Sequence, residues 1–180
     1  MKHTLTLDSP ALDFSDVAFL SILSSTPDFA LADDLNRLYD LDLCRVDDAM
    51  VGDLSLPLYH HSEPLRHLDC FLLRMPSEGT LAAAEGFLLL LRGSCCHEMA
   101  QTIERDFASP LPEPHPADLP AVCRHAILAR YQAAFTTVSV VRFTDDELLA
   151  ASAPGRRTLR GRAALADLFA RILDALDLRF

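Results

Sequence analysis

The sequence predicts an α+β fold, in which a single mainly antiparallel sheet carries packed helices and a C-terminal amphipathic helix follows. The first observation is Glu85–Gly93, where five consecutive apolar residues, 87–91, indicate a central strand buried on both faces. The second is the pair Ser55–His61 and His67–Met75, two apolar runs that a short connection joins as in an antiparallel hairpin. The third is the presence of apolar residues at helical spacing between and after these strands.

The first 50 residues are expected to form a strand, two helices and a second strand. Lys2–Leu7 alternates polar and apolar residues, as a half-buried strand does. For Phe14–Ser25 we favour a helix over a strand, although its apolar residues occupy nearly every position. Pro27–Asp40 is a helix in which Thr26 can act as the cap. Leu41–Val46 then reads as a strand.

The acidic residues Asp47 and Asp48 are expected to open a loop after that strand. Farther along, Ser94–Phe107 reads as a helix. The Pro-rich loop 108–118 has alternate prolines, which favour an extended connection. Asp118 is expected to cap the next helix. The inner face of that helix is predicted to hold Leu119, Val122, Cys123, Ala126, Ile127 and Ala133.

The end of the chain is predicted to contain one more strand and a final helix. The strand is Thr136–Phe143, and Asp145–Glu147 suit the N-terminus of a following helix. Pro154 and Gly155 interrupt the chain before the last helix. That helix has an apolar stripe at i, i+3, i+4, i+7, i+8 and i+11, formed by Leu165, Leu168, Phe169, Ile172, Leu173 and Leu176.

Charge divides the chain into two regions. Residues 1–150 carry 10 basic and 23 acidic side chains, whereas residues 151–180 carry 6 and 3. We therefore predict an α+β domain over 1–150, with loop 108–118 inside it, and an Arg-rich loop with a C-terminal helix over 151–180. The total charge of −10 makes this an acidic protein that repels phosphate backbones, so nucleic acid is an unfavoured partner.

Other features of the sequence lead us to expect a cytoplasmic protein. No apolar run approaches the ~18 residues that a membrane span needs, and the N-terminal residues lack the apolar core of a signal peptide. Five cysteines, an odd number without CxxC spacing, indicate reduced thiols. A membrane partner is not expected.

Two segments, Pro27–Asp48 and Glu85–Gly93, followed by Val138–Leu148, resemble in order and spacing the IPExxxVDY motif family of uncharacterised bacterial proteins. The resemblance covers roughly residues 1–150. At the motif positions, Gly79-Thr80-Leu81 and Glu85-Gly86-Phe87, only Phe87 is comparable. The resemblance implies a bacterial cytoplasmic origin and transfers no catalytic residue.

No sequence motif for phosphate binding, nucleophilic catalysis or metal binding occurs. The best metal candidate is the group His60, His61, His67 and Cys70, but neighbouring strand residues point to opposite faces, so we expect no metal and no cofactor. Cys96 beside His97 suggests a nucleophile and its base. However, neighbours on a helix do not face each other, so we expect no catalytic residue there.

The sequence favours a non-enzymatic protein-interaction or regulatory module. Its predicted interaction residues are on the last helix: Leu165, Leu168, Phe169, Ile172 and Leu176. A partner protein, or a second copy of the chain, would bind there. One alternative is a small enzyme with dispersed active-site residues. Another is RNA or phosphate-ligand binding by four anion-binding candidates, Arg156, Arg157, Arg160 and Arg162.

Overall fold

The computed structural model describes residues 12–76, 86–152, 159 and 161–177. These residues form two compact units. The larger unit, residues 15–141, contains a six-stranded antiparallel sheet and three α-helices. The smaller unit, residues 12–14 with the described residues from 142 onward, contains two further helices. The predicted α+β fold with a single antiparallel sheet and a C-terminal helix is confirmed.

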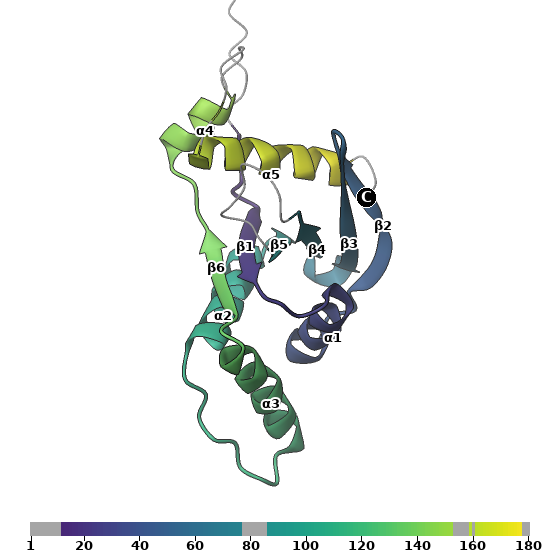
Figure 1. Cartoon of the computed structure of the whole chain (residues 1–180), viewed down its shortest axis with the longest axis vertical. Coiled ribbons are helices and arrows are strands. Elements are labelled where there is room, and N and C mark those ends of the chain that lie inside the picture. Colours follow the sequence, from purple (N-terminus) through teal and green to yellow (C-terminus); the bar gives the residue numbers. More distant parts are fainter. Residues whose placement is uncertain (1–11, 77–85, 153–158, 160, 178–180) are drawn as a thin grey trace, which may run out of the picture. The chain divides into compact units, whose positions relative to one another are not determined.

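The sheet has the strand order β2-β3-β4-β5-β1-β6 (Figure 1). Its strands are β1 Val17–Leu23, β2 Cys44–Val51, β3 Leu54–Glu63, β4 Leu68–Met75, β5 Gly86–Gly93 and β6 Thr137–Val141. The helices of the larger unit are α1 Asp28–Tyr39, α2 Cys96–Ala108 and α3 Leu119–Ala133, with a 3₁₀ turn, η1, at Pro64–Arg66. The smaller unit holds α4 Asp145–Ser152 and α5 Gly161–Asp177.

Strand β5 lies between β4 and β1, as its apolar run predicts. Leu89 and Leu90 point to opposite faces, and neither exposes any of its surface. On the Leu89 face, the sheet packs with α1, α2 and α3 in one apolar cluster that includes Leu35, Ile103 and Leu128. The opposite face, represented by Phe71 and Leu90, is also buried. The central-strand prediction is therefore confirmed.

The predicted helix at Phe14–Ser25 is wrong, because residues 17–23 form β1. This strand pairs with β5 on one side and β6 on the other. Val17 to Leu20, which point alternately to its two faces, are all buried, so both faces are covered. A strand with two buried faces has apolar residues without alternation, a pattern that periodicity cannot distinguish from a buried helix.

Two predicted boundaries near α1 and β2 need correction. Thr26 does not cap α1: Pro27 is the N-cap residue, and the Thr26 amide donates to Ser24 Oγ instead. Asp47 and Asp48 do not open a loop, since β2 continues to Val51. The two aspartates occupy an irregularity in the β2–β3 register between Val46 and Ala49, which is a β-bulge.

The predicted inner face of α3 is largely wrong. Asp118 does cap the helix, accepting a hydrogen bond of 3.1 Å from the Ala121 amide. However, the buried residues are Leu128 and Tyr131, whereas Leu119 is 69% exposed and Cys123 is exposed. Only the C-terminal half of α3 joins the apolar cluster, so the helix has no apolar face along its full length.

The other described elements agree with the sequence predictions. These are α1, the β3–β4 hairpin, α2, the connection 109–118, β6, α5, and α4 with its acidic first turn. The predicted strand Lys2–Leu7, the motif positions at 79–81 and the break at Pro154 and Gly155 lie outside the described residues.

Strands β2 and β6 are the edges of the described sheet (Figure 1), and acidic side chains act at both. Edge strand β2 has the Asp47–Asp48 bulge, and Asp48 accepts hydrogen bonds from Ser55 and Arg45. On edge strand β6, the Val140 amide donates to the Glu104 carboxylate of α2 at 2.7 Å. Each edge is thus modified by a side chain or a bulge where a bare strand would offer backbone groups to another strand.

Candidate functional site

Three adjoining hollows lie on the larger unit, and helix α2 lines two of them. The first, about 330 Å³, lies beyond the N-terminus of α2 and is lined by Ser62, Glu63, Pro64, His67, Leu68, Asp69, Arg92 and Gly93. The middle one, about 300 Å³, is lined by Tyr39, Leu41, Glu63, Arg66, Leu68, Cys95, Glu98, Met99 and Thr102. The third, about 290 Å³, is lined by Asp106, Leu111, Pro112, Glu113, Pro114, Ala121, Arg124, His125 and Leu128. We call the row the α2 groove.

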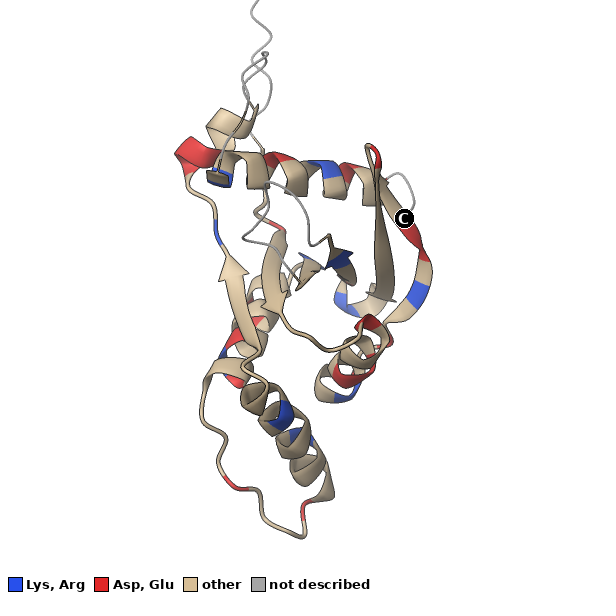
Figure 2. Ribbon diagram, viewed as in Figure 1, with Lys and Arg blue, Asp and Glu red and all other residues tan. Residues whose placement is uncertain are grey.

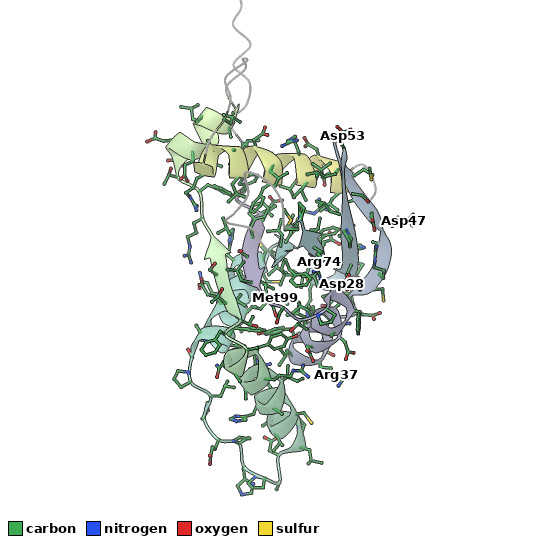
Figure 3. The ribbon with its side chains drawn as sticks, viewed as in Figure 1. Asp28, Arg37, Asp47, Asp53, Arg74 and Met99 are labelled. Carbon is green, nitrogen blue, oxygen red and sulfur yellow. The ribbon has the colours of Figure 1, made fainter. Side chains whose placement is uncertain are left out.

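The three hollows adjoin one another. The first and the middle hollow share Glu63 and Leu68. Between the middle and the third, the Tyr39 hydroxyl donates to Asp106 at 3.3 Å, and Arg124 lies over the Tyr39 ring at 5.3 Å. Successive turns of α2 supply the lining, because residues 95, 98, 99, 102 and 106 recur at helical spacing. Figure 3 labels Met99 of the middle hollow.

Backbone geometry allows the first hollow to form where β5 leaves the sheet. Gly93 has φ +123°, and a Cβ atom at this position would lie 1.6 Å from the His67 carbonyl oxygen. Only glycine permits this approach. His67 itself has φ 47° and ends the η1 turn. The close contact brings Arg92 of β5 beside Asp69 of β4, with 3.4 Å between Nη2 and Oδ2.

Asp69 is the centre of a polar network under the first hollow. Its carboxylate lies 3.5 Å from His60 Nε2 and 3.4 Å from Arg92 Nη2. Burial alone would raise the pKa of Asp69, but hydrogen bonds from Ser62 and His60 and the charge of Arg92 outweigh burial and lower it. Asp69 is therefore ionised at neutral pH.

His60 is the neutral member of this network. Its ring stacks on Phe71 with 4.6 Å between centroids, and its side chain is 13% exposed. Burial lowers the pKa of His60, opposed only partly by its hydrogen bond with Asp69. The imidazole is therefore uncharged at pH 7, and its contact with Asp69 is a hydrogen-bonding contact rather than an ion pair.

These residue types do not form a nucleophile activated by a base. In a Ser-His-Asp triad the histidine lies between the other two, whereas here Asp69 lies between Ser62 and His60. The Cys96–His97 pair is equally unsuited. Cys96 is buried and its pKa is raised by that burial, while His97 Nε2 lies 2.8 Å from the Ser15 carbonyl oxygen.

The histidines and cysteines near the groove do not converge on a cation site. Within the described ranges, no group of three or more His, Cys, Asp or Glu side chains could hold a metal ion. His60 contacts Asp69, whereas His61 Nδ1 accepts a hydrogen bond from the Asp42 amide at 3.0 Å. Cys70 is fully buried, and burial raises the pKa of its thiol to about 12, which disfavours the thiolate that binds metals.

Charges along the α2 groove are only partly matched. Each lining arginine has an acidic partner: Arg66 with Glu63, Arg92 with Asp69, and Arg124 with Asp106. Two further lining carboxylates, Glu98 and Glu113, form no ion pair with another described residue. The groove therefore has an excess of negative charge. The larger unit has eight arginines against eighteen acidic residues, a net charge of −10 (Figure 2).

The predicted anion-binding residues are described only in part. Arg156, Arg157 and Arg160 lie outside the described residues. Arg162, at the start of α5, pairs with Glu147 at 2.8 Å and lies over the Phe143 ring. It also donates to the Arg142 carbonyl oxygen. These contacts within the smaller unit already occupy its guanidinium group.

The five predicted interaction residues lie on one side of α5, as their spacing predicts. Leu165, Leu168, Phe169, Ile172 and Leu176 are all buried, each 7% exposed or less. Phe169 makes an edge contact with Phe143, at 5.7 Å between ring centroids. The stripe is therefore not an open surface in this structure.

Sequence reasoning missed the α2 groove. Its lining comes from α1, β3, η1, β4, β5, α2, α3 and the connection 109–118, and no local motif marks it. The one usable signal was the side of α2 formed by Cys95, Met99, Thr102 and Asp106, which is neither wholly apolar nor wholly charged.

Fold and site together define an antiparallel α+β protein with an open surface groove. No family model matches the sequence, and neither curated proteins nor solved structures give a match. The resemblance to the IPExxxVDY motif family therefore stays a prediction. No helix in the described parts of the chain is long and apolar enough to cross a membrane.

Proposed function

We propose that this protein is a non-enzymatic protein-interaction module whose α2 groove receives an extended segment of a partner protein. The observation that carries the proposal is the row of three adjoining hollows, two of which are lined by α2. The middle hollow has a mixed lining, in which the apolar residues Leu41, Leu68 and Met99 occur together with Glu63 and Glu98.

The dimensions of the groove favour a segment of chain over a compact ligand. From Cys95 to Asp106, α2 advances about 16 Å at about 1.5 Å per residue. An extended segment of about five residues, at about 3.3 Å each, has the same length. Each hollow is at or below the lower end of the ~300–1,000 Å³ that small-molecule sites occupy. A row of small hollows suits successive side chains of one peptide.

Blocking the middle hollow tests the proposal. Peptides would be selected from a random library displayed on phage, and their affinities measured by fluorescence anisotropy. Thr102 lines the hollow, whereas its neighbour Gln101 is exposed and lines none of the three. We expect Thr102→Trp to weaken the selected peptides at least tenfold and the matched control Gln101→Trp to leave their affinity within twofold. Equal affinities for both variants would refute the groove as the binding site.

Helix α5 is a second candidate contact element. The observation in its favour is a continuous apolar stripe in a separate compact unit. Over residues 1–14 and 142–180, the sequence has eight basic and eight acidic residues, so this part of the chain has no net charge. Since the stripe is buried, α5 would bind a partner or a second copy only in a state that uncovers it. Peptide binding that survives deletion of residues 154–180 would assign binding to the α2 groove alone.

A further inference from the structure

We infer that the segment bound in the α2 groove is basic, with lysine or arginine side chains next to apolar ones. This inference rests on the proposed function and specifies its partner. It follows from the unmatched carboxylates of the groove, Glu98 in the middle hollow and Glu113 in the third.

The ion pairs of the three lining arginines explain why the excess negative charge of the groove favours basic over acidic ligands. Arg66 Nε lies 3.3 Å from Glu63 Oε1, and Arg92 Nη2 lies 3.4 Å from Asp69 Oδ2. Arg124 is held by Asp106 and donates to the Leu38 carbonyl at 2.5 Å. An acidic ligand would meet only arginines whose charge a carboxylate already offsets. A basic ligand meets Glu98 and Glu113 without breaking any.

The two carboxylates are placed to act on successive parts of one segment. Glu98 is in the first turn of α2, and Glu113 is in the connection that walls the third hollow. The intervening surface includes the apolar side chain of Met99 and, past Thr102, that of the partly buried Leu111. A segment in which basic and apolar residues alternate can satisfy both, since alternate side chains of an extended chain point to opposite sides.

Charge over the whole larger unit acts in the same direction. A net charge of −10 attracts basic partners at a distance and repels acidic ones, and the effect falls as salt shortens the screening length from about 30 Å at 0.01 M to about 10 Å at 0.1 M. This general attraction raises the rate of association and adds little selectivity. Selectivity for the groove must therefore be shown against a control that changes the same charge elsewhere.

The experiment uses the full-length chain and three labelled eight-residue peptides. Leucine alternates with lysine in the first, with glutamine in the second and with glutamate in the third. Anisotropy titrations at 50 mM NaCl are expected to give at least tenfold tighter binding for the lysine peptide than for the other two. At 300 mM NaCl this preference should shrink severalfold.

Two double variants separate the groove from general charge. Glu98→Gln with Glu113→Gln is expected to weaken the lysine peptide about threefold to tenfold, as loss of two exposed charge contacts should. The control, Asp47→Asn with Asp53→Asn, makes the same charge change on the β2 side (Figure 3) and should alter affinity less than twofold. Equal effects of both double variants would overturn the inference.

The outcomes also separate this inference from the proposed function. If the glutamine peptide binds as tightly as the lysine peptide, and Thr102→Trp weakens both, the groove binds peptides without charge preference, and only the inference fails. If Thr102→Trp leaves lysine-peptide binding unchanged, or no peptide binds, the proposed function and the inference both fail.

Discussion

The buried hydrogen bond between Tyr131 and Asp34 joins α3 to α1, and it can be tested by one double-mutant cycle. The Tyr131 hydroxyl donates to Asp34 Oδ2 at 2.6 Å, and both residues are buried, at 1% and 6% exposure. Burial raises the pKa of Tyr131, and the contact with Asp34 raises it further, so the phenol is protonated and remains a donor. Hydrogen bonds to charged groups contribute about 1.5–3 kcal/mol.

Tyr131→Phe removes only the hydroxyl, so we expect it to lower the free energy of unfolding by about 1.5–3 kcal/mol. Asp34→Ala should cost at least as much, because it leaves a buried phenol and Arg130 without their carboxylate. If the two effects report one interaction, the double variant loses about 1–2 kcal/mol less than their sum.

Urea denaturation of the wild type, the two single variants and the double variant measures each free energy. Tyr39→Phe serves as a matched control, since its hydroxyl donates to Asp106 at the longer distance of 3.3 Å in a half-buried position. We expect it to cost about 1 kcal/mol or less. Additive effects of Tyr131→Phe and Asp34→Ala, within about 0.3 kcal/mol, would refute the coupling.

Three further predictions concern the sheet and the C-terminal helix. Leu89→Asp and Leu90→Asp should each unfold the protein or make it insoluble, because both leucine side chains are fully buried. An unpaired buried carboxylate costs several kcal/mol, whereas the total free energy of unfolding of a protein is about 5–15 kcal/mol. A variant that is soluble and stable in thermal melts would contradict this prediction. Burial lowers the pKa of His60 below its ordinary value of 6.5, so the folded chain favours the neutral imidazole, and the fold loses this stabilisation as pH falls below 6.5 through the folded pKa. Urea denaturation at pH 7.5 and 5.5 should therefore show a smaller drop in the free energy of unfolding for His60→Gln than for the wild type. An equal drop in both proteins would exclude the effect. Deletion of residues 154–180 should cause self-association that light scattering detects, because the apolar side chains that cover the α5 stripe would themselves become exposed to water. A monomer with unchanged stability would show that the stripe is dispensable.

Sequence patterns predicted elements whose burial is one-sided or whose ends carry a specific signal. The α5 stripe and the Asp118 cap are examples. The same patterns failed at β1, where both faces are covered, and on α3, where half of the helix borders a loop. In both cases, burial is decided by contacts with residues that are distant in sequence, and the periodicity of one segment carries no information about those contacts.

The candidate site could not be predicted for a related reason. Glu63, Glu98 and Arg124 are ordinary surface residues in their own segments, and their meaning comes from the hollows that folding places between them. The sequence also does not show which charged groups form ion pairs. Which carboxylates are matched by arginines depends on contacts such as Arg92 with Asp69, residues 23 positions apart.

The acidic features at the two sheet edges have a consequence for how this protein behaves when concentrated. A β-strand with unpaired backbone groups can add a strand from another molecule, and this addition can repeat without limit. Here the Glu104 carboxylate occupies the Val140 amide of β6, and the Asp47–Asp48 bulge distorts β2 and places charge on it. Fibre growth would first have to displace a carboxylate at one end of the sheet or bury aspartates at the other. Resistance to such fibre growth thus rests on three acidic side chains, Glu104, Asp47 and Asp48.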